Sequence, residues 1–171
     1  MNTLSLNKTK PTPVALLTSV YMKIVTSSDP KSLKGIEALQ KAEKRLSDII
    51  LSITSESKED DDLKSKLNDI DKLSLSVGSP IEALANGYRT IFSGEIDENK
   101  HTDEEVTLFY SDSLDAIREA LLDIPCETSK DEAEKLRLVP YILWEGDSTL
   151  TVLEKDCKKL IEEVASRKEA R

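Results

Sequence analysis

Few side chains in this sequence have the type and spacing that catalysis requires. General acid–base and nucleophilic catalysis need a base, most often histidine, and the single histidine, His101, lies in the polar run DENKHTDEE. A histidine in such a run is typical of an exposed surface loop, so we assign it no catalytic role. Cys126 follows Pro125 at an expected helix end, whereas Cys157 lies on an apolar helix face, where a thiol behaves as a small hydrophobic group. We therefore expect Cys126 to react before Cys157, and we predict no catalytic residue.

The sequence also lacks motifs for a nucleotide cofactor or a metal ion. It contains no glycine-rich phosphate-binding loop and no HExxH motif. An EF-hand loop starting at Asp97 would need glycine and glutamate where the chain has Thr102 and Leu108. Two cysteines make neither a disulfide framework nor a metal cluster, which is typical of a reducing compartment. We expect no cofactor and no bound metal.

The run VPYILWEGDS, residues 139–148, concentrates aromatic side chains in a chain that has few of them. Only 4% of the residues are aromatic, yet Tyr141 and the single tryptophan, Trp144, lie here. Pro140 is expected to end or kink the preceding helix, and Gly146 to close the segment, which predicts a corner between two helices. The two rings could pack in that corner, anchor a protein partner or line an active site. Packing is favoured, and Tyr141 and Trp144 are the candidate partner contacts.

Helix-start signals and apolar periodicity predict the elements that carry these residues. A capping residue followed by proline marks three helix starts, Thr12-Pro13, Asp29-Pro30 and Ser79-Pro80. The spacing of a capping box marks two more, Thr102–Glu105 and Ser129–Glu132. Apolar residues three and four positions apart indicate a further helix over 63–77, and Asp147 is expected to cap the last helix.

These signals predict an all-α fold. The chain has only 5 glycines and 6 prolines in 171 residues and is rich in helix-forming residues. We expect a single helical bundle of about five to seven helices. Residues 1–11 would be a flexible N-terminal segment, and residues 12–168 a single α-helical domain. Within that domain we expect residues 55–62, SESKEDDD, to form a mobile acidic loop.

Negative charge is concentrated in the middle of the chain. The net charge is −9, and residues 58–134 hold twenty-one acidic against eight basic side chains. This segment would repel nucleic acid, whereas a protein partner with a basic surface would complement it. No apolar run is long enough to span a membrane. We expect an intracellular protein, cytoplasmic or nuclear. The acid-free first 28 residues also fit an organelle-targeting segment, but they lack arginine, so this alternative is less favoured.

The absence of a catalytic constellation and the long amphipathic helices together indicate a function. We predict a non-enzymatic helical adaptor, scaffold or regulatory subunit that acts through protein–protein contacts. The alternative is a small helical ligand-binding protein or enzyme with a pocket near Tyr141 and Trp144.

Overall fold

The computed structural model describes residues 10–70, 78–144 and 150–169, and within them it contains helices and no strands. The helices are α1 (Pro13–Val25), α2 (Leu33–Ser52), α3 (Lys58–Lys66), α4 (Pro80–Phe92), α5 (Asp103–Thr107), α6 (Ser113–Asp123), α7 (Ser129–Trp144) and α8 (Leu150–Glu169). A 3₁₀ turn, η1 (Leu67–Asp69), follows α3, and a π-helical turn, η2 (Leu108–Asp112), joins α5 to α6 without a break. Counting this joined helix once, the described residues form seven helices, which confirms the all-α prediction.

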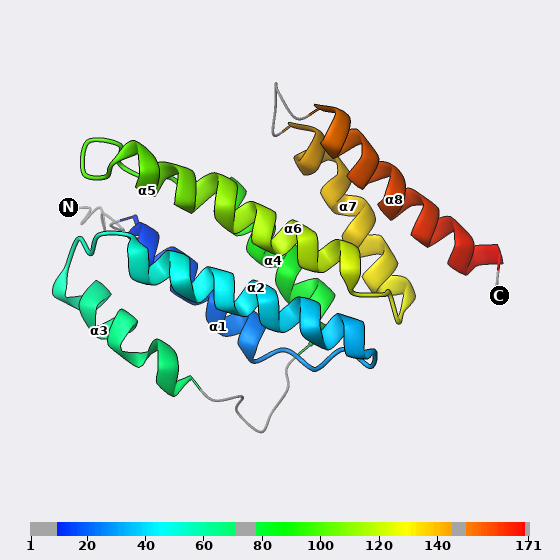
Figure 1. The fold of residues 1–171 in the computed structure, drawn as a ribbon, viewed down its shortest axis with the longest axis horizontal. Coiled ribbons are helices and arrows are strands. Elements are labelled where there is room, and N and C mark those ends of the chain that lie inside the picture. The colour runs from blue at the N-terminus through cyan, green and yellow to red at the C-terminus, as the bar shows by residue number, and fades with distance from the viewer. Residues whose placement is uncertain (1–9, 71–77, 145–149, 170–171) are drawn as a thin grey trace, which may run out of the picture.

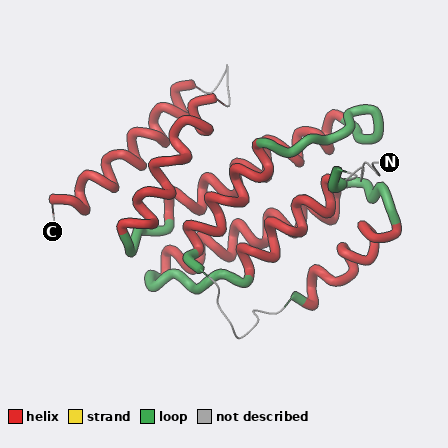
Figure 2. Tube along the Cα trace, turned by 180° about the vertical axis from the view of Figure 1, so that it is seen from behind, coloured by secondary structure: helices red, strands yellow, loops and turns green. Residues whose placement is uncertain are grey.

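The core lies between α1, α2, α4 and α6, which contact one another in a closed ring (Figure 1). Each of these helices contributes a fully buried side chain, such as Leu17, Leu46, Tyr88 and Ile117. Outside the ring, α3 packs against α1, and α7 packs against α4. Helix α8 packs on α7 and contacts the edge of α6, so α7 and α8 form an antiparallel pair on one side of the molecule (Figure 2).

Serine and threonine side chains determine where the helices begin. Thr12 accepts a hydrogen bond from the Ala15 N–H (3.1 Å), which confirms the predicted start of α1. The start predicted at Asp29-Pro30 is wrong, because Ser32 caps α2 by accepting from the Gly35 N–H at 3.0 Å. A Cβ atom on Gly35 would lie only 2.7 Å from the Pro30 side chain, so this glycine lets the chain fold tightly across the first turn of α2.

The cap of α7 lies one residue before its predicted position. The Thr128 hydroxyl oxygen accepts from the Asp131 N–H (3.1 Å), and the Asp131 carboxylate accepts from the Thr128 N–H (3.0 Å). This reciprocal pair occupies the place predicted for Ser129 and Glu132. Glu132 instead forms an ion pair with Arg167 of α8 at 3.2 Å.

The acidic run at residues 55–62 is only partly a loop. Ser57 caps α3, whose first residue is Lys58. Asp60 is only 1% exposed and accepts hydrogen bonds from the Thr12 hydroxyl (2.5 Å) and the Glu56 N–H (2.8 Å). Burial of this one carboxylate ties α3 to the start of α1 and corrects the expected loop. The mobility predicted for the run remains a prediction. The helix predicted over 63–77 is corrected, because α3 begins at Lys58 and ends at Lys66, where the 3₁₀ turn η1 follows. Residues 71–77 lie outside the described residues.

Helix α7 continues through Pro140 to Trp144, so the predicted corner over 139–148 is also corrected. Pro140 has no N–H to donate to the carbonyl oxygen of Leu136. Both residues are exposed, so water can bond that oxygen without disturbing the core. Residues 145–149, including Gly146 and Asp147, lie outside the described residues.

The turn η2 widens the α5–α6 helix where it passes the connection from α4. Phe109 is fully buried, and the Tyr110 hydroxyl donates to the Gly94 carbonyl oxygen at 3.0 Å. A Cβ atom on Gly94 would meet Leu16 at 3.0 Å and Phe109 at 3.2 Å, so the backbone of this connection lies directly against the core.

Candidate functional site

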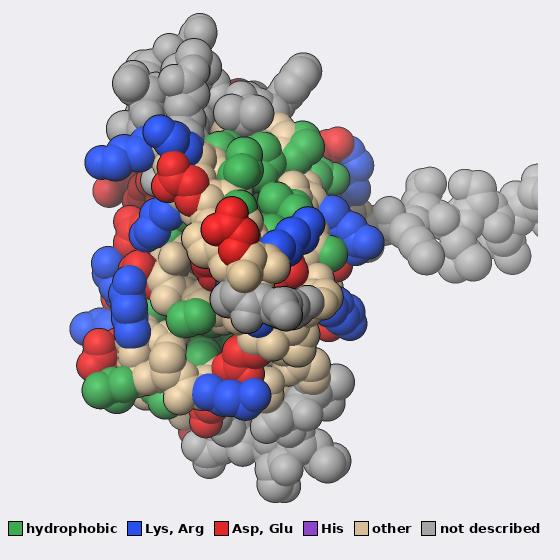
Figure 3. Space-filling view, turned by 90° about the vertical axis from the view of Figure 1, so that its right-hand side faces the viewer, with side chains coloured by type: hydrophobic (Ala, Val, Ile, Leu, Met, Phe, Trp, Pro, Cys, Tyr) green, Lys and Arg blue, Asp and Glu red, His purple; other side chains and the backbone are tan. Residues whose placement is uncertain are grey.

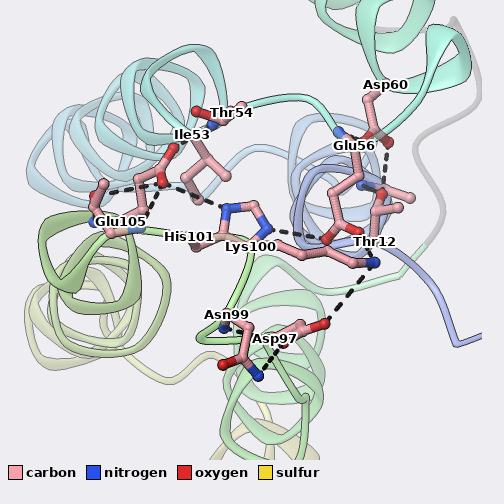
Figure 4. A network of polar contacts seen from close by, with 12 residues as sticks. Thr12, Ile53, Thr54, Glu56, Asp60, Asp97, Asn99, Lys100, His101 and Glu105 are labelled. Atoms are coloured by element: carbon pink, nitrogen blue, oxygen red, sulfur yellow. Dashed lines mark hydrogen bonds and ion pairs between the residues drawn. The ribbon is translucent and has the colours of Figure 1, made fainter.

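His101 lies in a buried network of charged side chains at one end of the bundle (Figure 4). Its side chain has no exposed surface. Nε2 is 2.9 Å from an oxygen of Glu56, in the connection between α2 and α3, and Nδ1 is 3.5 Å from an oxygen of Glu105 in α5. The expectation of an exposed loop histidine is therefore wrong. The two carboxylates that enclose the ring come from segments far apart in the sequence.

Glu105 links the start of α5 to the connection between α2 and α3 through its carboxylate. It accepts hydrogen bonds from the Thr102 N–H (2.9 Å), which completes the predicted capping box, and from the Thr54 N–H (2.5 Å). Hydrogen bonds from Thr54 and Thr102 lower the pKa of Glu105 to about 2, against the opposing effect of burial. Glu105 is therefore an anion at neutral pH, although it is only 7% exposed.

Glu56 occupies the other side of the ring and extends the network to α3. Hydrogen bonds from His101 and Lys100, the latter at 2.8 Å, lower the pKa of Glu56. The Glu56 N–H donates to Asp60, which in turn holds Thr12. A continuous set of polar contacts therefore joins the starts of α1, α3 and α5 to the connections that precede α3 and α5.

Exposed carboxylates surround this buried network. Glu59, Asp61 and Asp62 lie at the start of α3, and Asp97, Glu98, Asp103 and Glu104 lie before and at the start of α5; all seven are exposed, and we call them the acidic end face. Both starts lie at the same end of the molecule in Figure 1, near the start of α1. Among the described residues, only Asp97 of these seven has a cationic partner, Lys100 at 3.9 Å.

The opposite end of the molecule has no comparable excess of one charge. Figure 3 shows that face, with Lys and Arg side chains interspersed with Asp and Glu and with hydrophobic side chains gathered in its upper part. Ion pairs cross it, for example Lys34 with Asp123 at 3.0 Å and Lys31 with Glu127 at 3.0 Å. Of the two ends, the one at the starts of α3 and α5 therefore has the larger excess of exposed acidic side chains, although Lys58 and Lys100 are exposed there too.

A pocket of about 510 Å³ lies beside the network, between the start of α1 and the connection from α4 to α5. Its lining includes Pro11, Pro13 and Ile96 together with charged side chains. The two lysines of the lining are already paired, Lys10 with Glu95 and Lys100 with Glu56. The pocket therefore has no unpaired cation for an anionic ligand.

The geometry of the network is that of a structural contact between segments and not that of an acid–base catalytic centre. A general base must reach the proton that it abstracts, and the fully buried His101 ring faces two carboxylates of the same chain. Among the residues that the structure describes, no group of three His, Cys, Asp or Glu side chains is placed to hold a metal ion.

Tyr141 and Trp144, the predicted partner contacts, lie far along the chain from this network. Tyr141 is half-buried, and its ring lies edge-on to Phe92 of α4, with ring centroids 5.3 Å apart. Trp144 is the last residue of α7, but its side chain lies outside the described residues. The role of the two residues as partner contacts remains a prediction, and Tyr141 does not line the pocket beside His101.

The two cysteines differ less than the sequence predicts. Both Cys126 and Cys157 are 5% exposed. Burial raises the pKa of the Cys126 thiol to about 12, so the expectation of a reactive Cys126 is not supported.

A second buried charge, which sequence reasoning missed, connects α7 to α8. Lys135 is fully buried and donates from Nζ to the Ile124 carbonyl oxygen (2.6 Å) and to Glu163 of α8 (2.9 Å). The Glu163 carboxylate also accepts from the Cys126 N–H at 3.1 Å. No local signal marks Lys135, because lysines on helices are usually exposed.

Comparison with known proteins returns no match: no family model fits the chain, and no curated protein or solved structure is significantly similar to it. Within the described part of the chain, none of the helices is both long enough and apolar enough to cross a membrane.

Proposed function

We propose that this protein is a non-enzymatic adaptor, scaffold or regulatory subunit, and that its acidic end face binds a basic segment of a protein partner. One observation carries the proposal: carboxylates from two separate segments gather at one end, above a buried network that joins those segments. Six of the seven have no ion pair with another described residue, so their charge is available to a partner.

Electrostatic physics favours a partner of opposite charge. A surface of one sign accelerates encounter with a complementary partner and disfavours partners of the same sign. Contacts among Glu56, Lys100 and His101 hold the two segments together before any partner arrives. Preorganisation of this kind reduces the entropy lost on binding.

The inaccessibility of the histidine and of both cysteines supports a role without catalysis. The His101 ring is enclosed and both thiols are buried. The two free cysteines also support our assignment of the adaptor to a reducing compartment, the cytoplasm or the nucleus.

A fluorescent lysine- and arginine-rich peptide tests the proposal through fluorescence anisotropy at low ionic strength. We expect the double variant Asp62→Asn/Glu98→Gln to raise the Kd of this peptide roughly three- to tenfold. The matched control is Glu37→Gln/Asp48→Asn, which removes the same charge from exposed positions of α2. The control should change the Kd less than about twofold.

Two results would contradict the proposal. An equal loss of affinity in both variants would show that the peptide responds only to net charge. A wild-type protein that fails to bind the peptide would rule out a basic partner at this face.

A further inference from the structure

We propose that the pocket between the start of α1 and the α4–α5 connection binds an arginine side chain of the protein partner, and that Lys10 competes for this place. The inference deepens the proposed function, because the pocket adjoins the acidic end face and receives one residue of the same basic segment. It rests on the proposed function for the partner and on the pocket itself for the site.

The pocket has the volume of a ligand site and two kinds of lining. Its volume of about 510 Å³ lies within the range of ligand pockets, about 300–1,000 Å³. Pro11, Pro13 and Ile96 supply apolar surface, and Ile96 packs against the hydrophobic core. The other lining residues are polar or charged: Lys10, Thr12, Glu56, Glu95, Asp97 and Lys100. Apolar surface next to charged groups suits a long side chain with an apolar stem and a charged head.

The charges of the lining favour a cation. Lys100 lies between Glu56, at 2.8 Å, and Asp97, at 3.9 Å (Figure 4), so its charge is already balanced. Hydrogen bonds from the backbone and side-chain amides of Asn99 lower the pKa of Asp97, which therefore stays ionised at neutral pH. Once Lys10 has left, three carboxylates and one ammonium group line the pocket.

The start of α1 does not oppose a cation in this pocket. A helix N-terminus carries partial positive charge because its first N–H groups lack partners within the helix. Pro13 has no N–H, and the Thr12 hydroxyl oxygen accepts from the Ala15 N–H at 3.1 Å. The carboxylate of Asp60, only 1% exposed, accepts from the same hydroxyl at 2.5 Å. A buried anion therefore offsets the positive end of α1.

Lys10 shows how a cation meets this lining. Its ammonium group donates to the carboxylate of Glu95, and the two side chains are 74% and 68% exposed. Such a pair contributes little to stability because solvent screens it. The cation of a partner can therefore replace Lys10 at small cost, and Lys10 acts as a weak internal competitor.

Arginine fits this lining better than lysine does. A guanidinium group is planar and weakly hydrated, so its faces pack on apolar surface while its edge donates to carboxylates. The pocket offers both, since Glu95 and Asp97 flank Ile96 in the chain and all three residues line it. The ammonium group of lysine is a compact and strongly hydrated charge that gains less from the apolar surface.

NMR titration of the intact chain with N-acetylarginine amide tests the site. We expect saturable shifts of the backbone amide signals of Thr12, Ile96 and Asp97, and none at Gly35 in the first turn of α2. N-acetyllysine amide should bind at least about threefold more weakly. N-acetylcitrulline amide, which has a similar shape without the charge, should not bind. Equal shifts with citrulline, or arginine shifts that spare Thr12 and Ile96, would overturn the inference.

The variant Lys10→Gln tests the competition. Because it removes the internal competitor, we expect the Kd of N-acetylarginine amide to fall about twofold to fivefold. The matched control is Lys58→Gln, which removes the same charge from an exposed position at the start of α3, outside the lining. It should change the Kd by less than about 1.5-fold. Equal gains in both variants would overturn the role of Lys10.

The variant Ile96→Ala tests the apolar lining without a change of charge. We expect it to raise the Kd of N-acetylarginine amide about threefold or more. Leu51→Ala is the control, because Leu51 is 49% exposed in the last turn of α2 and does not line the pocket. An unchanged Kd in a folded Ile96→Ala protein would overturn the site. If this variant does not fold, the wild-type shifts and Lys10→Gln decide the question.

The lysine- and arginine-rich peptide separates this inference from the proposed function. Asp62 and Glu98, the acids replaced to test that function, do not line the pocket. Peptide binding weakened by Asp62→Asn/Glu98→Gln but not by Ile96→Ala would overturn the arginine site and leave the proposed function standing. Arginine-dependent shifts at Ile96 in a protein that fails to bind the peptide would overturn the proposed function and support the pocket.

Discussion

Cys126 and Cys157 are both 5% exposed, and burial raises the pKa of Cys126 to about 12. Because the thiolate is the reactive form, we expect neither cysteine to be alkylated appreciably at neutral pH in the native protein. Both should react once urea unfolds the chain. Mass spectrometry of alkylated peptides measures each site separately, and rapid native labelling of either site would show that its helix opens or faces solvent.

Glu105 makes the stability of the protein sensitive to acid. Its pKa is about 2 in the folded protein, below the ordinary value of 4.5, so its ionised form is stabilised by folding. This contribution is fully present above about pH 4.5 and is lost as the pH falls towards 2. Glu105→Gln should therefore be less stable than the wild type at pH 7, and this difference should shrink over the same interval.

Urea denaturation at a series of pH values measures the difference. Glu104→Gln is the matched control, because Glu104 is an exposed neighbour in the first turn of α5. A difference for Glu105→Gln that stays constant down to pH 2 would show that its carboxylate does not provide the stabilisation.

At the scale of elements, Lys135 and Glu163 hold α8 against α7. Removal of one partner leaves a buried charge without its counterion, which typically costs about 3 kcal/mol or more. We expect Glu163→Leu to lower the free energy of unfolding by that amount. Lys135→Met/Glu163→Leu should recover most of the loss, since an apolar pair of similar volume is often neutral.

An exposed pair provides the control for this prediction. Lys41 of α2 and Glu119 of α6 are 3.0 Å apart, with side chains 67% and 47% exposed. Lys41→Gln should cost less than about 1 kcal/mol because solvent screens such pairs. If Lys41→Gln and Glu163→Leu were equally harmful in urea denaturation, burial would not be the property that matters.

Local sequence signals predict the helix boundaries that depend only on neighbouring residues. The start of α4 at Ser79-Pro80 and the capping box at Thr102–Glu105 are confirmed, because each depends on residues within one turn. The helix start predicted at Asp29-Pro30 and the corner predicted at Pro140 are wrong. Helix α2 begins after the Ser32 cap, and α7 continues through Pro140, which is exposed. These are properties of the folded chain.

The candidate site was not predictable, because it too depends on contacts that form only in the folded chain. His101 and Glu56 are 45 residues apart, and neither belongs to a recognisable motif. Only Glu105 carried a local signal, its place in the capping box. The polar surroundings of His101 in the sequence indicated exposure, whereas these surroundings supply part of the network that buries it.

At the scale of the whole molecule, one continuous hydrophobic core includes residues from α1 to α8. A core of this kind unfolds cooperatively in a small domain. We expect far-ultraviolet circular dichroism and the fluorescence of Trp144, the only tryptophan, to show coincident urea transitions. Two separate midpoints would indicate that the α7–α8 pair unfolds independently of the α1, α2, α4 and α6 ring.

The π-helical turn η2 should allow the protein to tolerate the deletion of one residue at this position. Each residue added to an α-helix turns everything beyond it by about 100°, whereas a wide turn absorbs one extra residue and leaves both flanking faces in place. Deletion of the exposed Ser111 should therefore yield an uninterrupted α5–α6 helix with a melting temperature close to that of the parent. A single deletion inside α2 should instead rotate half of its apolar face out of the core. We therefore expect natural variants that have lost one residue from a helix to have lost it at η2 more often than in the other helices.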